Sequence, residues 1–262
     1  CPCLMISSFL NMDYSIVNFK KAMTFFASSL LIQFLFFIVL FIIFGRKYDD
    51  AKYRVLSVCG TLGNVGFFGL PIVTSLFPNE PVVACYSTVN VASMNLLCFT
   101  VGVFLITNDK KFISIKSAFL NPTTSSFLLA LPLYLLQVHF PVFIVDSITL
   151  MGKITTPLSM VIIGFRLASI PLKTVFTQKF AYQACLIKLI LFPIFALALI
   201  TLMPFADDVF KTCIFVLGGA PAGAVILSLS ELHECEQKNT ANAVLLTTLL
   251  SLITVPVLML FV

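Results

Sequence analysis

Few residues in this chain could take part in covalent, acid–base or redox chemistry. The 262 residues include two histidines, His139 and His233, and only 10% of all residues are charged. Catalysis needs a nucleophile, a base or a metal ion within reach of one another. The two histidines fall in separate polar segments, so no such group of residues is predicted. We therefore expect that the protein is not an enzyme.

The eight cysteines do not indicate a metal site either. They are scattered, mostly through apolar stretches, and no CxxC pair occurs. The CPC at the start of the chain is isolated, and the HECE segment at 233–236 has no second group of ligands nearby, which argues against zinc. The sequence also lacks a GxxxxGKS or GxxxxGKT loop for ATP. No metal and no cofactor are predicted.

The residues with potential for binding are glycines, prolines and amides inside apolar stretches. One stretch is interrupted by four glycines and a proline, namely Gly60, Gly63, Gly66, Gly69 and Pro71. Another is interrupted at GGAPAGA, around Pro221. Proline removes a backbone donor, and glycine weakens a helix. Breaks of this kind expose helix N-termini that attract anions, and the neighbouring Asn64 could add an amide donor.

The composition indicates that these elements lie in a lipid bilayer. Sixty per cent of the residues are apolar and the mean hydropathy is +1.08, whereas a soluble domain carries about 25% charged residues. The apolar runs are continuous and do not alternate with period two, which favours helices over a transmembrane barrel. We expect a multi-pass integral protein of the plasma membrane, with lipid as its surroundings and no nucleic acid partner.

Continuous apolar stretches predict eight complete spans. They cover residues 22–44, 55–77, 82–107, 121–138, 142–168, 180–203, 209–230 and 240–262. Residues 1–10 are interpreted as the second half of a helix whose beginning is missing. Alternate loops carry eleven Lys and Arg against three in the others. The positive-inside rule then places loops 45–54, 108–120 and 169–179 in the cytoplasm.

Several polar residues within the predicted spans have two interpretations. A lysine inside a span is a functional candidate by default. Lys153 fits that description, but it could equally lie at the outer interface with its ammonium reaching the headgroups. Lys188 is about two turns into its span, so we expect its side chain to reach the cytoplasmic interface. Asn90 and Asn95 are compatible both with helix packing and with lining a cavity.

The two halves of the chain repeat the same order of features. CPCLMISSFLNM resembles TPLSMVIIGFRL, which matches Pro2 with Pro157, and the interrupted spans follow with Pro71 and Pro221 after 69 and 64 residues. This predicts a first repeat at 1–107, a linker at 108–120 and a second repeat at 121–262. Repeats of five spans have opposite orientations, and paired interrupted spans typically mark a transporter's substrate site. The alternative is that both prolines merely kink their helices.

The residues around the interruptions resemble the auxin efflux carrier family, which includes plant PIN carriers and bacterial homologues. GNVGFFGLP at 63–71 is similar to the family's broken fourth helix, and TPLSM at 156–160 with IGFRLA at 163–168 to its seventh. APA at 220–222 and LLTTLLSLITVPVLM at 245–259 resemble its ninth and tenth. The resemblance implies ten helices in two inverted five-helix repeats, with two broken crossover helices, as in bile-acid-symporter-like folds. The short linker resembles the prokaryotic type, and by this comparison we expect that the family's first helix is missing from the given sequence.

The resemblance also implies a substrate site for organic anions. The asparagine of the family's fourth helix matches Asn64, and a nearby backbone position matches Gly66. Two positions after the ninth-helix proline match Ala224 and Val225, and the residue before the second-helix proline matches Cys1. The two prolines at the interruptions and Lys153 are added to these positions. The predicted substrate-binding residues are Cys1, Asn64, Gly66, Pro71, Lys153, Pro221, Ala224 and Val225.

The predicted function is secondary transport of small organic anions by alternating access. Energy would come from gradients or from the membrane potential, since no nucleotide site is expected. The expected partners are the anion and the bilayer, and a homodimer is compatible with the family. The alternative is a sensor or assembly subunit that has the same fold and no transport activity.

Overall fold

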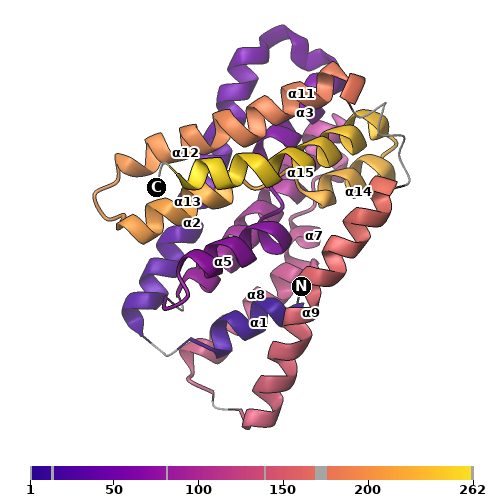
Figure 1. Ribbon diagram of the computed structural model, residues 1–262. Coiled ribbons are helices and arrows are strands. Elements are labelled where there is room, and N and C mark those ends of the chain that lie inside the picture. The colour runs from indigo at the N-terminus through magenta and orange to yellow at the C-terminus, as the bar shows by residue number, and fades with distance from the viewer. Residues whose placement is uncertain (1, 13–14, 81, 139, 169–175, 261–262) are drawn as a thin grey trace.

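The chain is folded as a bundle of α-helices in the computed structural model, which describes residues 2–12, 15–80, 82–138, 140–168 and 176–260 (Figure 1). Within these ranges the regular structure is helical, apart from one isolated antiparallel bridge between Gly63 and Ala222. The predicted all-α class is confirmed for this part of the chain.

Most of the helices lie within the stretches predicted as spans, whereas α7 lies in the predicted linker at 108–120. The first part of the chain forms α1 (Pro2–Leu10), α2 (Ile16–Phe44), α3 (Ala51–Thr61), a π-helical segment (Val65–Gly69) that leads into α4 (Leu70–Leu76), α5 (Val82–Leu97), a second π-helical segment (Cys98–Gly102) and α6 (Val103–Thr107). The second part forms α7 (Ile115–Leu120), α8 (Pro122–Leu135), α9 (Val142–Ala168), α11 (Lys179–Leu186), a third π-helical segment (Ile187–Leu191), α12 (Phe192–Thr201), α13 (Asp208–Gly218), α14 (Ala224–Leu232) and α15 (Gln237–Met259).

Side-chain caps set several helix starts. Helix α2 begins earlier than residue 22 because the Ser15 hydroxyl accepts a hydrogen bond from the Val17 amide at 3.2 Å. Aspartates cap α3 and α13 in the same way, through Asp50 and Asp207. Asn121 caps α8, whose first residue is a proline with no amide to satisfy.

Four continuous helical runs are long and apolar enough to cross a membrane among the described residues. They are Ile16–Asp49, Val82–Thr107, Lys179–Thr201 and Gln237–Met259. Large apolar side chains cover the outside of the bundle, for example Ile42 on α2 and Phe143 on α9, which are 71% and 80% exposed. Such surfaces suit contact with lipid chains, in agreement with an integral membrane protein.

Two interrupted helices cross at the centre of the molecule. Helix α3 ends at Thr61 and the next helical segment begins at Val65, while α13 ends at Gly218 and α14 begins at Ala224. The two non-helical segments pair antiparallel: the Asn64 amide donates to the Pro221 carbonyl at 2.6 Å, and the Gly223 amide donates to the Leu62 carbonyl at 3.1 Å. These bonds satisfy backbone groups that the breaks would otherwise leave unpaired in a nonpolar environment.

The first interruption does not lie at Pro71, contrary to the expectation from sequence. The helix is open at residues 62–64, and Pro71 lies in the first turn of α4, directly after the π-helical segment. A proline is tolerated at this position because the first turn of a helix, or a turn that follows a π-helical segment, does not require a hydrogen bond from the proline nitrogen. Pro221, in contrast, lies within the second break as predicted.

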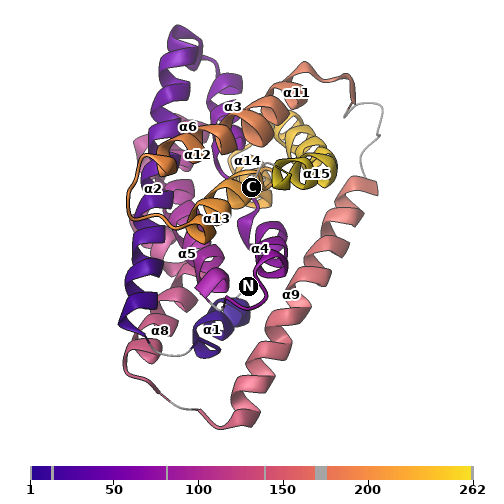
Figure 2. The same ribbon diagram turned by 60° about the vertical axis from the view of Figure 1, so that its left-hand side comes forward.

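Aromatic packing joins α2, α5 and the start of α13. Phe25 of α2 stacks on Tyr86 of α5 with ring centroids 4.4 Å apart, and Phe210 of α13 contacts both rings. On the other side, α1 packs against α8 and α9, where Phe9 contacts Phe127. Figure 2 shows α9 along one edge of the molecule, with α4 and α1 on its inner side.

Candidate substrate site at the helix crossing

Four of the predicted site residues line one cavity beside the crossing. Asn64 and Gly66 come from the first interrupted helix, and Ala224 and Val225 come from the start of α14. The cavity has a volume of about 140 Å³. The remaining wall comes from α5 and from the start of α8, through Val91, Met94, Asn95, Asn121 and Thr123.

Both half-helices present their N-termini to this cavity without a side-chain cap. Neither Asn64 nor Gly223, the residues at the two N-cap positions, makes a capping hydrogen bond through a side chain. This differs from α2, α3, α8 and α13, which are all capped. The first N–H groups of a helix have no partner inside it and carry partial positive charge. Two such ends facing one cavity favour a bound anion.

Side-chain amides add donors to the same cavity. Asn64 is 7% exposed, and its side chain makes no hydrogen bond to any residue that the structure describes. Asn95 makes one long contact, from its Nδ2 to the Thr124 hydroxyl at 3.5 Å. No acidic residue is among those that line the cavity. The environment is therefore rich in donors and lacks a competing negative charge.

Gly66 allows the first half-helix to lie close to α5. A Cβ atom built at this position would be 3.1 Å from Cγ2 of Val91, which is tighter than ordinary packing. The lack of a side chain also leaves the backbone of the first helical turn open toward the cavity. Gly66 therefore lies at the cavity with no side chain of its own, and its part in binding stays a prediction.

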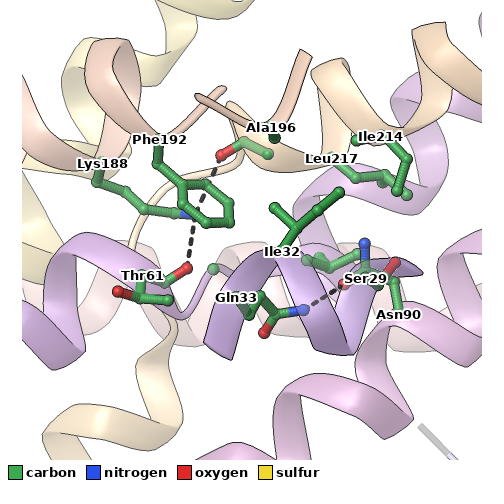
Figure 3. A pocket seen from close by; sticks show the side chains of 13 residues that line it. Ser29, Ile32, Gln33, Thr61, Asn90, Lys188, Phe192, Ala196, Ile214 and Leu217 are labelled. Carbon is green, nitrogen blue, oxygen red and sulfur yellow. Dashed lines mark hydrogen bonds between the residues drawn. The ribbon is translucent and has the colours of Figure 1, made fainter. Parts of the chain in front are cut away.

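Lys188 is the residue that the sequence interpretation placed wrongly. Its side chain is 1% exposed and does not reach an interface. Its Nζ donates to the carbonyls of Thr61 at 3.1 Å and Gly218 at 3.0 Å, and lies 4.2 Å from the ring centroid of Phe192 (Figure 3). Thr61 and Gly218 are the last residues of α3 and α13. The ammonium therefore meets the negative ends of both half-helices.

The remaining predicted residues lie elsewhere. Pro71 and Lys153 line a separate cavity of about 380 Å³ between α1, α4 and α9, where Lys153 is exposed. Pro221 contributes its carbonyl to the crossing and does not line the 140 Å³ cavity. Cys1 lies outside the described residues. The two amides of α5 have different surroundings. Asn95 lines the 140 Å³ cavity at the crossing, whereas Asn90 accepts a hydrogen bond from Gln33 at 3.4 Å.

Comparisons with known proteins point to a family of membrane transporters. Residues 107–259 match the model of a family described as membrane transport protein. The chain is also 26% identical over 213 residues to a protein of Methanocaldococcus jannaschii that is described as an uncharacterized transporter. That alignment covers 80% of this chain and 68% of the relative. The family match includes the second half of the crossing.

Proposed function

Because the chain belongs to the membrane transport protein family, which includes the auxin efflux carriers, we propose that it is a secondary transporter for small organic anions. Family membership confirms the predicted resemblance and indicates an integral membrane transporter. The finer assignment, to organic anions, rests on the 140 Å³ cavity, where two uncapped half-helix N-termini and several amides meet without an acidic residue.

A carboxylate is the ligand that this cavity matches best. Its two oxygens accept hydrogen bonds only, and the cavity offers first-turn amides from Val65 and Ala224 together with the Asn64 side chain. A hydrogen bond to a charged group contributes roughly 1.5–3 kcal/mol. Two or three such bonds, with the partial charges of two helix ends, are enough for the micromolar to millimolar affinity of a carrier.

Alternating access would use the crossing as the fixed element. We propose that the halves 1–107 and 121–262 are inverted repeats around it, which is supported by the matched order of interrupted helices in the two halves. The loops 45–54, 108–120 and 169–179 would lie on the cytoplasmic side of the plasma membrane. Lys153, exposed in the 380 Å³ cavity, would attract anions toward the protein.

Uptake by reconstituted vesicles tests the proposed function. The purified protein is inserted into liposomes and offered labelled monocarboxylates, dicarboxylates and an indole-type acid, with a neutral amino acid and an organic cation as controls. The expected result is saturable uptake of at least one carboxylate, and none of the cation. Folded protein that binds carboxylates but does not move them would favour a sensor. Uptake of the cation alone would contradict the anion assignment.

A further inference from the structure

A third, much smaller cavity lies on the Lys188 side of the crossing (Figure 3). Its volume is about 20 Å³, which is room for one water molecule or one small ion. Ser29 and Gln33 of α2 and Thr61 at the end of α3 line it together with Lys188. No acidic residue is among its lining residues.

Three oxygen atoms in this wall have no partner in the described structure. They are Oγ of Ser29, Oε1 of Gln33 and Oγ1 of Thr61, and their residues are 2%, 5% and 1% exposed. The orientation of Gln33 is set by its other atom, because Nε2 donates to Ser93 at 3.1 Å and to Asn90 at 3.4 Å. Oε1 can only accept, so it requires a donor or a cation. Unpaired buried acceptors are rare in native proteins.

Two backbone carbonyls complete a set of oxygens around the same place. Nζ of Lys188 already contacts the carbonyls of Thr61 and Gly218, the last residues of the two half-helices. Carbonyl, hydroxyl and amide oxygens are hard, neutral ligands, and half-helix C-termini are a typical place for a monovalent cation in transporters. The negative ends of two helices add to the attraction.

Gly63 shows how closely the ammonium fits this place. A Cβ atom built at Gly63 would be 2.9 Å from Nζ and 3.0 Å from Cε of Lys188, and 3.4 Å from the Ala220 carbonyl oxygen. A side chain at position 63 would therefore require the Lys188 ammonium to shift away from the first break. The charged group is therefore in direct contact with the backbone of the crossing.

We propose that the Lys188 ammonium is a built-in cation: it occupies a monovalent-cation site formed by the C-termini of α3 and α13, and it makes a free ion there unnecessary. If the ammonium is removed and its space left open, Na⁺ or K⁺ should bind in its place. The bound ion would be held by the carbonyls of Thr61 and Gly218 and by the unpaired oxygens of the adjoining cavity. This inference concerns the crossing itself and does not depend on which substrate is carried.

Thermal melting in different salts tests the proposal. The detergent-solubilised protein is compared with Lys188→Ala, which opens the space, and Lys188→Met, which fills it with apolar atoms. Each is melted in NaCl, KCl and choline chloride at equal ionic strength. We expect the unsubstituted protein to melt at one temperature in all three salts. Lys188→Ala should melt lower in choline and regain stability with Na⁺ or K⁺ in a saturable manner. Lys188→Met should gain nothing from either ion.

A matched control separates this effect from general effects of salt. Lys179→Ala removes an exposed lysine from the start of the same helical run, so its melting temperature should not depend on the cation. Equal loss of stability by Lys188→Ala in all three salts would overturn the proposal, because it would show only a lost packing or hydrogen-bonding role. Stabilisation of the unsubstituted protein by Na⁺ or K⁺ over choline would also overturn it.

A double variant is used if Lys188→Ala does not fold in choline chloride. Purification is then repeated in NaCl and KCl, and the double variant Lys188→Ala/Gln33→Glu is added. The new carboxylate replaces the unpaired amide oxygen with a charged ligand, so it should make recovery of folded protein depend more strongly on Na⁺ or K⁺. If both variants fail to fold in every salt, a cation cannot replace the ammonium and the proposal is wrong.

Discussion

Replacing Asn64 gives a quantitative test of the larger crossing cavity. The Asn64 backbone amide holds the crossing through the Pro221 carbonyl at 2.6 Å, and alanine keeps that bond. The side chain lines the cavity and has no hydrogen-bond partner among the described residues. Asn64→Ala should therefore remove one donor to the substrate and leave the protein's stability nearly unchanged.

The size of the effect follows from the kind of bond that is lost. A hydrogen bond from an amide to a charged carboxylate contributes roughly 1.5–3 kcal/mol. Substrate affinity should fall between about tenfold and hundredfold, since 1.4 kcal/mol corresponds to a factor of ten. Asn64→Asp should bind still more weakly, because it places a negative charge beside the anion.

Binding and melting must be measured together on the same preparations. Affinity for a transported carboxylate is measured by calorimetry or by competition in vesicles, and stability by the melting temperature. Asn90→Ala is the matched control, because Asn90 is equally buried at 7% exposure but makes a hydrogen bond with Gln33. It should lose stability and keep the affinity of the folded fraction. If Asn64→Ala behaves like this control, Asn64 is a packing residue and the helix termini alone bind the anion.

Three further tests concern the crossing, the topology and a surface ion pair. Gly63→Ala should lower the melting temperature, with a cost of about 1–3 kcal/mol for forcing a methyl group against the buried ammonium, whereas Gly164→Ala, with open space around it, should be neutral or stabilising. A single cysteine at position 50, in a background without other cysteines, should react with an impermeant reagent from the cytoplasmic side only. Burial tends to raise the pKa of Asp207, but hydrogen bonds from Lys21 and from a helical amide, together with nearby positive charges, hold it below its ordinary value. The ion pair should therefore stabilise the protein at pH values above the ordinary carboxyl pKa. This stabilisation should be lost as the pH falls through the lowered pKa of Asp207. Asp207→Asn should flatten that part of the stability curve, by less than about 1 kcal/mol because both side chains are more than 40% exposed.

The helices and the two interruptions could be predicted because each leaves a local signal. Twenty or more consecutive apolar residues define a span whatever its neighbours are, and glycine and proline inside such a stretch mark a weak point. The exact place of the first break could not be predicted. Gly63 and Pro71 both disrupt helices, and only the pairing of residues 62–64 with the second break determines which one does so here.

The division of roles within α5 was partly readable from spacing. Asn90 and Asn95 are five residues apart, which places their side chains about 140° apart around a helix. They therefore face different neighbours, Gln33 in one case and the crossing cavity in the other. A lysine near a helix end has no comparable signal. The position of Lys188 depends on two C-termini that are far away in sequence and meet only in the folded protein.

The crossing separates opposite partial charges, and this connects the two sites. The two N-terminal ends line the 140 Å³ cavity, whereas both C-terminal ends contact the Lys188 ammonium. An anion in the cavity and the cation at Lys188 would each stabilise one end of the paired half-helices. Since the low-dielectric surroundings screen charge poorly, the ammonium would also attract the anion across the crossing. Removing the Asn64 donor and removing the Lys188 charge should therefore weaken anion binding by different routes. A double-mutant cycle with Asn64→Ala and Lys188→Ala distinguishes two outcomes. If the two effects on anion affinity are independent, their free energies add. If the crossing collapses without Lys188, Asn64→Ala has no further effect in the Lys188→Ala background.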